Sequence, residues 1–174
     1  MCSLHGPVLH KEQLADVLAA SDTWSAYRPE TDGILVAYTS IYGHTADAAE
    51  QLAEELRTKG QQVVVMDLAR CDMAEAVAQA FRFSKLVLAT PTYNGDVFPF
   101  TKTFIEHLTE RNYQNRTVAL MENGSWAPTA ARVMRKMFEA SKNLTYAATT
   151  VTVRGALNAA NEAQIAALAD ELSE

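Results

Sequence analysis

The stretch that decides the fold is Gly33-Ile-Leu-Val-Ala-Tyr-Thr-Ser-Ile-Tyr-Gly-His-Thr45. Its first part, Ile34 to Tyr38, is an apolar run typical of a strand buried on both faces of a parallel sheet. Hydroxyl residues and a glycine follow, and a helical pattern begins at once. A strand that opens through such a loop onto a helix N-terminus favours anion binding, because free N–H groups and the positive end of the helix dipole converge there.

The loop after this strand contains no lysine or arginine. It matches neither the G-x-x-x-x-G-K-[ST] motif of nucleotide triphosphatases nor the G-x-G-x-x-G motif of dinucleotide folds. A phosphate held by neutral donors alone favours FMN over ATP or NAD as the ligand. An ordinary helix cap is the alternative, since Ser and Thr are common cap residues. The candidate phosphate-binding residues are Thr39, Ser40, Ile41, Tyr42, Gly43, His44 and Thr45.

Strand and helix patterns alternate along the rest of the chain. Further strands are expected over 62–66, 85–90, 117–121 and 146–153, and helices over 44–59, 73–82, 99–110, from about Pro128, and over 161–172. Short connections and right-handed crossovers turn this alternation into a doubly wound α/β fold. We expect a five-stranded parallel sheet in the flavodoxin-like order 2-1-3-4-5.

Three unusual loops, over 39–45, 90–96 and 122–126, follow the first, third and fourth strands, so all three open at one edge of the sheet. Ligands of such sheets bind at that edge. Tyr93 and Trp126 are large aromatics in loops, where they would frame a planar ligand. Asn-Gly in the second loop is also a common turn dipeptide, which is the simpler explanation there. The candidates for the ligand's ring are Pro91, Thr92, Tyr93, Asn94, Gly95, Asn123, Gly124, Ser125 and Trp126.

Composition narrows the class of protein. The 174 residues are 48% hydrophobic and carry a net charge of −6, which argues against a nucleic-acid partner. An acidic surface would suit a basic redox partner, or serve solubility alone.

No apolar run approaches the length of a membrane span, and no signal peptide is visible in the sequence. Cys2 and Cys71 form no spacing motif, so we expect free thiols and a cytoplasmic protein.

The first loop resembles the phosphate loop of flavodoxins. The segment Pro91–Gly95 with Phe98-Pro99, and the segment Asn123–Trp126, resemble the second and third flavin loops of flavodiiron proteins (A-type flavoproteins). This resemblance implies a flavodoxin-like FMN domain that relays electrons from a reductase or rubredoxin-like donor to an iron-site acceptor. The resemblance is also compatible with assembly of the protein into a homo-oligomer. The alternative function is that of an NAD(P)H-dependent quinone or flavin reductase on the same fold. A third interpretation is a protein that keeps the fold but binds no flavin.

Residues 1–32 form an N-terminal tail, and residues 33–174 the flavodoxin-like domain. The stretch from Cys2 to Leu9 resembles the end of the metallo-β-lactamase-like domain that precedes the flavodoxin domain in flavodiiron proteins, so His5 would match its final iron ligand. The other histidines, His10, His44 and His107, lack the H-x-[HE]-x-D spacing of a diiron site. One histidine cannot hold two irons, so we expect no bound iron and no diiron catalytic site in this chain. Whether the chain is itself an enzyme stays open.

Overall fold

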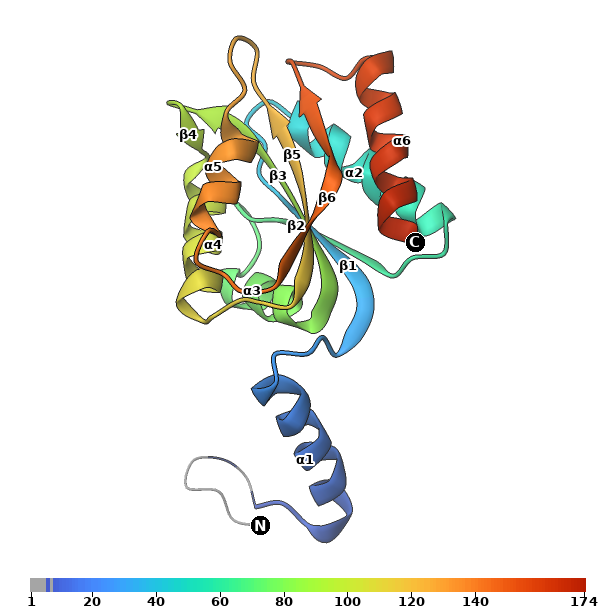
Figure 1. The fold of residues 1–174 in the computed structure, drawn as a ribbon, viewed down its shortest axis with the longest axis vertical. Helices are drawn as coiled ribbons and strands as arrows, with labels where there is room; N and C mark the ends of the chain where they lie inside the picture. Colours follow the sequence, from blue (N-terminus) through green and yellow to red (C-terminus); the bar gives the residue numbers. More distant parts are fainter. Residues whose placement is uncertain (1–5, 7) are drawn as a thin grey trace.

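The computed structural model describes residues 6 and 8–174 and has a parallel sheet at its centre (Figure 1). The strand order is β2-β1-β3-β5-β6, and each neighbouring pair is parallel. Counted without the short β4, this is the order 2-1-3-4-5, so the predicted flavodoxin-like fold is confirmed. The strands are β1 (Thr31–Tyr38), β2 (Val63–Asp67), β3 (Phe83–Tyr93), β5 (Arg116–Asn123) and β6 (Leu144–Val153).

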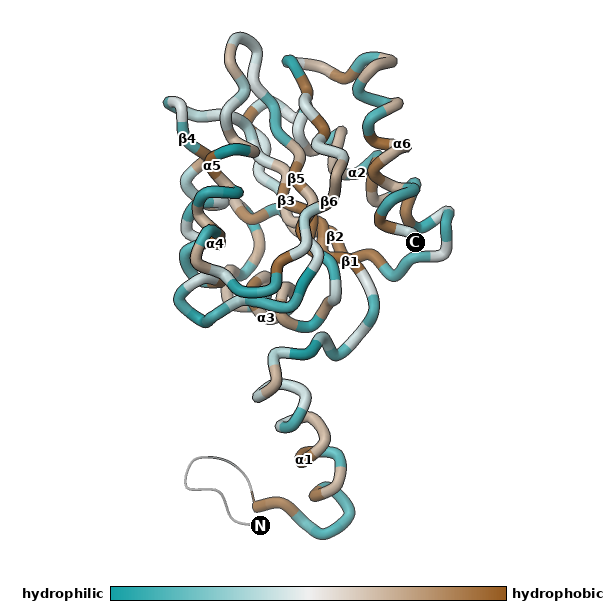
Figure 2. The backbone as a smooth tube through the Cα atoms, in the orientation of Figure 1, coloured by the Kyte–Doolittle hydropathy of each residue, from teal (hydrophilic) through white to brown (hydrophobic). Residues whose placement is uncertain are grey.

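Helices cover both faces of the sheet (Figure 1). One face packs against α2 (His44–Thr58) and α6 (Ala159–Ser173), and the other against α3 (Met73–Arg82), α4 (Pro99–Glu110) and α5 (Ala130–Met137). Successive residues of a strand point to opposite faces, so Ile34 enters the first layer and Leu35 the second. Figure 2 shows the hydrophobic segments gathered in the strands between the two layers. Burial on both faces explains why the central strands are continuously apolar.

The second loop contains a strand that the sequence did not reveal. β3 runs on to Tyr93, and β4 (Asp96–Val97) pairs with it antiparallel. Asn94 and Gly95 connect the two strands with φ values of 51° and 73°. Two central residues with positive φ are what a type I′ hairpin turn requires, and Asn-Gly is the favoured pair. The expected loop over 90–96 is therefore a hairpin with Asn94-Gly95 at its turn.

Helix α1 (Lys11–Ser25) stands apart from both layers and buries none of its residues (Figure 1). The spacing of Leu14, Val17 and Leu18 predicts a short helix over 11–20, and the observed helix extends further, to Ser25. The resemblance proposed for Cys2 to Leu9, and the candidate ligand His5 with it, fall mostly outside the described residues. Among the described residues, no helix combines the length and the apolarity needed to cross a bilayer.

Arg116 joins the segments at the amino ends of the strands, opposite the candidate site. Its side chain is 3% exposed, and its guanidinium donates to five backbone carbonyls. Burial lowers the pKa of this group. The carbonyl dipoles nevertheless satisfy its donors without a carboxylate. The carbonyls belong to Tyr27, Phe81, Phe83, Gln114 and Asn115.

Candidate functional site

The three predicted loops meet around a hollow of about 180 Å³ at the carboxyl edge of the sheet. The strand order explains this, because the first and third loops follow strands that flank β3, and the second loop follows β3 itself. The lining residues are Ser40, Ile41, Tyr42, His44, Thr45, Pro91, Thr92, Asn123, Gly124, Ser125 and Gly155. The sequence therefore identified all of this lining except Gly155.

The first loop leads onto an uncapped helix. Gly43 has φ 94° and stands at the N-cap of α2, where no side chain caps the helix. Its N–H donates to the Ser40 hydroxyl at 3.1 Å. Thr45, in the first turn, is only 4% exposed and lines the hollow. The N–H groups of the first turn and one hydroxyl are thus available to an anion in the hollow.

Thr39 does not line the hollow but supports it from below. Its hydroxyl lies 2.8 Å from the hydroxyl of Thr90 and 2.9 Å from that of Thr101, and all three residues are fully buried. The backbone N–H of Phe98 also donates to Thr90, at 3.4 Å. This network ties the start of the first loop to the hairpin and to α4. The expected direct contact of Thr39 with phosphate has no support in its position.

Thr92 joins the second loop to the third. The N–H groups of Thr129 and Ala130 donate to its hydroxyl oxygen at 3.0 and 3.3 Å. In return, the Thr129 hydroxyl donates to the carbonyl of Gly95 at 3.2 Å. A Cβ on Gly124 would lie 3.0 Å from the Cα of Pro128 and 3.1 Å from the Thr92 hydroxyl, so any larger residue would require these neighbours to shift.

Glu122 supports the start of α5 from the end of β5. This carboxylate is 8% exposed and accepts from the Ala131 N–H at 2.9 Å and from the Thr152 hydroxyl at 3.1 Å. The N-terminal N–H groups of α5 thus bond to side chains of neighbouring strands. The helix begins at Ala130, two residues later than the expected start at about Pro128.

Asn123 fastens the third loop to the end of β6. Its amide accepts from the Gly155 N–H at 3.0 Å and donates to the Gly155 carbonyl at 2.9 Å. The N–H of Gly124 donates to the carbonyl of Val153 at 3.0 Å. Gly155 itself has φ 89°, which favours glycine. The sequence signal for this fourth loop was a glycine shortly after the last strand.

The aromatic candidates stand at the outer rim. Trp126 is 96% exposed and lines a second hollow of about 350 Å³ together with Gly95. The two hollows share Thr92, Gly124 and Ser125, so they adjoin. The second also exposes Ala127 and Thr129, which the sequence did not identify. The remaining candidates, Gly43, Tyr93 and Asn94, line neither hollow.

Tyr93 packs beside the site rather than within it. Its ring meets that of Phe98 edge to face, with centroids 5.4 Å apart, and the ring of Phe98 in turn lies 6.0 Å from that of Phe100.

Within the described residues, no cluster of three or more His, Cys, Asp or Glu side chains could hold a metal ion.

The fold and the site define a doubly wound α/β protein with a hollow at the carboxyl edge of its sheet, beside the N-terminus of α2. The flavodoxin family model matches residues 36–169, so the chain belongs to the flavodoxin family. The resemblance seen in the sequence is confirmed at this level.

Several longer proteins are similar to the chain. The anaerobic nitric oxide reductase flavorubredoxin of Pectobacterium atrosepticum is 24% identical over 149 residues, which are 84% of this chain and 29% of that protein. The structure of rubredoxin oxygen:oxidoreductase from Desulfovibrio gigas matches with a TM-score of 0.86 at 18% identity, covering 93% of this chain and 40% of that one. A flavodoxin of Streptococcus pneumonia matches with a TM-score of 0.69 at 20% identity, covering 80% of this chain and 96% of that one. The chain thus spans less than half the length of the flavorubredoxin and the oxidoreductase.

Proposed function

We propose that the chain binds one FMN and transfers electrons between a protein donor and an iron-site acceptor of flavodiiron type. The observation that supports this most is the convergence of three loops at one edge, around the uncapped N-terminus of α2 and without any lysine or arginine in the lining. The similarity to a flavorubredoxin and to a rubredoxin oxygen:oxidoreductase supports a rubredoxin-like donor.

The residues of the first hollow fit the phosphate of FMN. Backbone N–H groups at the start of α2 and the hydroxyls of Ser40 and Thr45 are neutral donors, and the helix dipole adds positive potential. Thr45 is the strongest single candidate, because it lies in the first turn of α2 and lines the hollow, where its hydroxyl could donate to a bound phosphate.

The residues of the second hollow fit the flavin ring. Trp126 and the backbone of Gly95 and Gly124 border an opening that an aromatic system can enter. Bound there, the flavin would accept and release electrons one or two at a time. The protein's part is to orient the ring, exclude water from one face, and offer backbone groups of the hairpin to its polar edge.

The acceptor would be an iron site supplied by another domain or chain. Because the described residues contain no metal-binding cluster, we propose that a metallo-β-lactamase-like diiron domain of a partner receives the electrons.

Replacing Thr45 by valine tests the cofactor assignment. A hydrogen bond to a charged group contributes about 1.5–3 kcal/mol, so Thr45→Val should weaken FMN binding by roughly 10- to 100-fold. Riboflavin, which lacks the phosphate, should bind almost as before, and Thr45→Ser should restore FMN binding. Fluorescence titration of the flavin-free chain measures both ligands. Equal losses for FMN and riboflavin would place the phosphate elsewhere.

A further inference from the structure

Helix α5 carries three exposed cations, Arg132, Arg135 and Lys136, and no acidic residue. Among the described residues, none of the three lies within ion-pair distance of an acid, whereas several lysines and arginines elsewhere do. The three cations are three and four residues apart, so their charges repel one another on adjacent turns of the helix. The helix dipole favours Arg135 and Lys136, which lie in the last turn, but opposes Arg132 in the first turn. The helix therefore holds positive charge that its surroundings do not neutralise.

All three cations line one hollow of about 500 Å³ beside the amino end of β6. Leu144 and Tyr146, the first and third residues of that strand, line it too, and Glu139 is its one acidic residue among those described. Sites for small molecules in proteins have volumes of roughly 300–1,000 Å³, so the hollow is large enough for such a ligand. It lies at the opposite end of the sheet from the candidate flavin site and shares no lining residue with that site. A ligand here would therefore be separate from the flavin.

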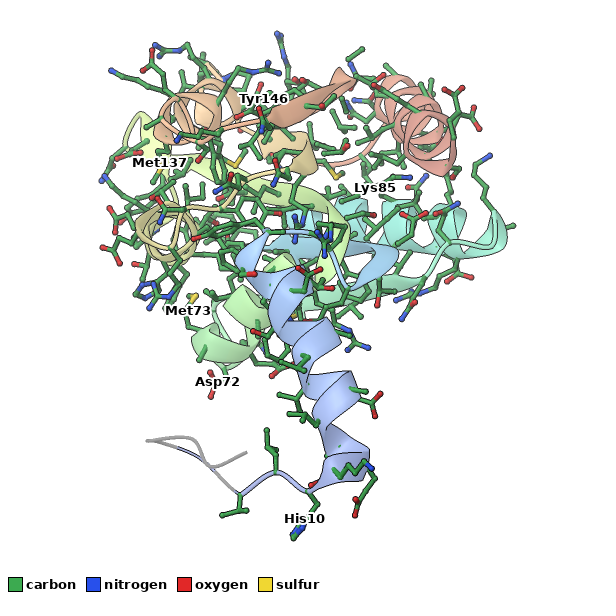
Figure 3. The ribbon with its side chains drawn as sticks, turned by 60° about the horizontal axis from the view of Figure 1, so that its bottom comes forward. His10, Asp72, Met73, Lys85, Met137 and Tyr146 are labelled. Atoms are coloured by element: carbon green, nitrogen blue, oxygen red, sulfur yellow. The ribbon has the colours of Figure 1, made fainter. Side chains whose placement is uncertain are left out.

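One side of the hollow suits a planar group. Figure 3 shows Tyr146, from β6, beside α5. The guanidinium of Arg135 stands over the Tyr146 ring, 4.1 Å from its centroid, so this contact orients the planar cation. A guanidinium held on one face by an aromatic ring can stack a nucleobase on its other face. Phe138 and Leu144 add apolar surface to the same hollow.

The remaining cations suit two linked phosphates. Arg132 and Lys136 are four residues apart, which places their side chains side by side on the helix surface. An arginine binds a phosphate with two parallel hydrogen bonds, and a lysine adds a second point charge. We propose that this hollow binds a nucleoside diphosphate, with its base stacked on Arg135 and its phosphates paired with Arg132 and Lys136. The bound anion would also remove the repulsion among the three cations, so it should stabilise the folded chain.

Calorimetric titration of ADP into the FMN-loaded chain tests the proposal, because bound FMN keeps ADP out of the candidate flavin site. Charge-assisted hydrogen bonds contribute about 1.5–3 kcal/mol each, so Arg132→Gln/Lys136→Gln should weaken ADP binding by roughly tenfold or more. The control, Arg57→Gln/Arg70→Gln, removes the same charge from exposed residues outside α5 and should leave ADP affinity nearly unchanged. Adenosine lacks the phosphates and pyrophosphate lacks the base, so each should bind more weakly than ADP.

A second measurement uses the wild-type protein alone and so does not depend on the folding of a variant. ADP should shift the NMR signals of the Tyr146 ring and of the α5 amides, and it should raise the melting temperature of the FMN-loaded chain. The proposal would be overturned by a wild-type chain that does not bind ADP, or by equal ADP affinity in the wild type and the α5 variant. Pyrophosphate that binds as tightly as ADP, or NMR shifts confined to the carboxyl edge of the sheet, would overturn it as well. FMN affinity should be the same in all three proteins, so the proposed cofactor function is tested separately.

Discussion

Thr92 is a candidate cofactor-binding residue, and its hydroxyl oxygen also accepts hydrogen bonds at the start of α5. Removing this hydroxyl separates the two roles. The change to valine keeps the shape of the side chain and deletes the oxygen that accepts from Thr129 and Ala130 at 3.0 and 3.3 Å. Thr129, at the N-cap of α5, makes no side-chain capping bond of its own. The two N–H groups would therefore depend on water.

The expected magnitude follows from the capping energy. Loss of a capping oxygen costs about 0.5–2 kcal/mol, and two N–H groups share this one, so we expect Thr92→Val to lower the free energy of unfolding by about 1–2 kcal/mol. For a chain of this size the melting temperature should drop by roughly 2–8 °C. Thr92→Ser keeps the oxygen and should lose only a small part of this. Thr103→Val, at an exposed position of α4, is the matched control and should stay within about 0.5 kcal/mol of the wild type.

The assay is urea unfolding of the flavin-free chain, followed by circular dichroism, with FMN titrations on the folded proteins. Because the hydroxyl joins the second loop to the third, FMN affinity should fall together with stability. A valine variant as stable as the wild type would refute the capping role. If such a variant still lost FMN affinity, the hydroxyl would instead contact the cofactor directly.

Two further predictions concern other parts of the molecule. Burial of Glu171 opposes its ionisation, but the N–H groups of Ala148 and Thr149 and the Thr149 side chain hold the pKa of this carboxylate below its usual 4.5. The contribution of the ionised Glu171 to stability is therefore complete above pH 4.5 and is lost as the pH falls through the lowered pKa. In urea unfolding between about pH 3 and 7, the wild type should lose its stability advantage over Glu171→Gln at the acidic end. The purified FMN-loaded chain should oxidise NADH and NADPH only slowly with a quinone as acceptor, because no nicotinamide motif is present; saturable quinone reduction without added protein would instead support the reductase alternative.

The sequence predicted what local patterns determine. Apolar runs ending in hydroxyl and glycine residues located the strands, and the order of the sheet then brought three loops to one edge. Ser40, Thr45 and Asn123 were found in this way, because each lies in a loop that follows such a run.

Tertiary contacts determine what the sequence did not show. The start of α5 depends on acceptors from Thr92, 38 residues before Ala130, and from Glu122, nine residues before Ala131, so the expected start at about Pro128 was too early. Thr39 looked like a phosphate donor, yet its partners Thr90 and Thr101 are 51 and 62 residues away. The strand β4 has only two residues and forms because the Asn-Gly turn reverses the chain, which no periodicity can reveal.

The carbonyl contacts of Arg116 have a kinetic consequence. They join segments up to 89 residues apart, so they can form only after the central strands have assembled. We expect these contacts to be absent from the folding transition state. Their main effect is then on the unfolding rate, which they would keep low, while the folding rate would hardly depend on them. The Arg116 contacts would thus form last during folding and slow unfolding. The lifetime of the native state would then depend on the end of the sheet opposite the candidate site.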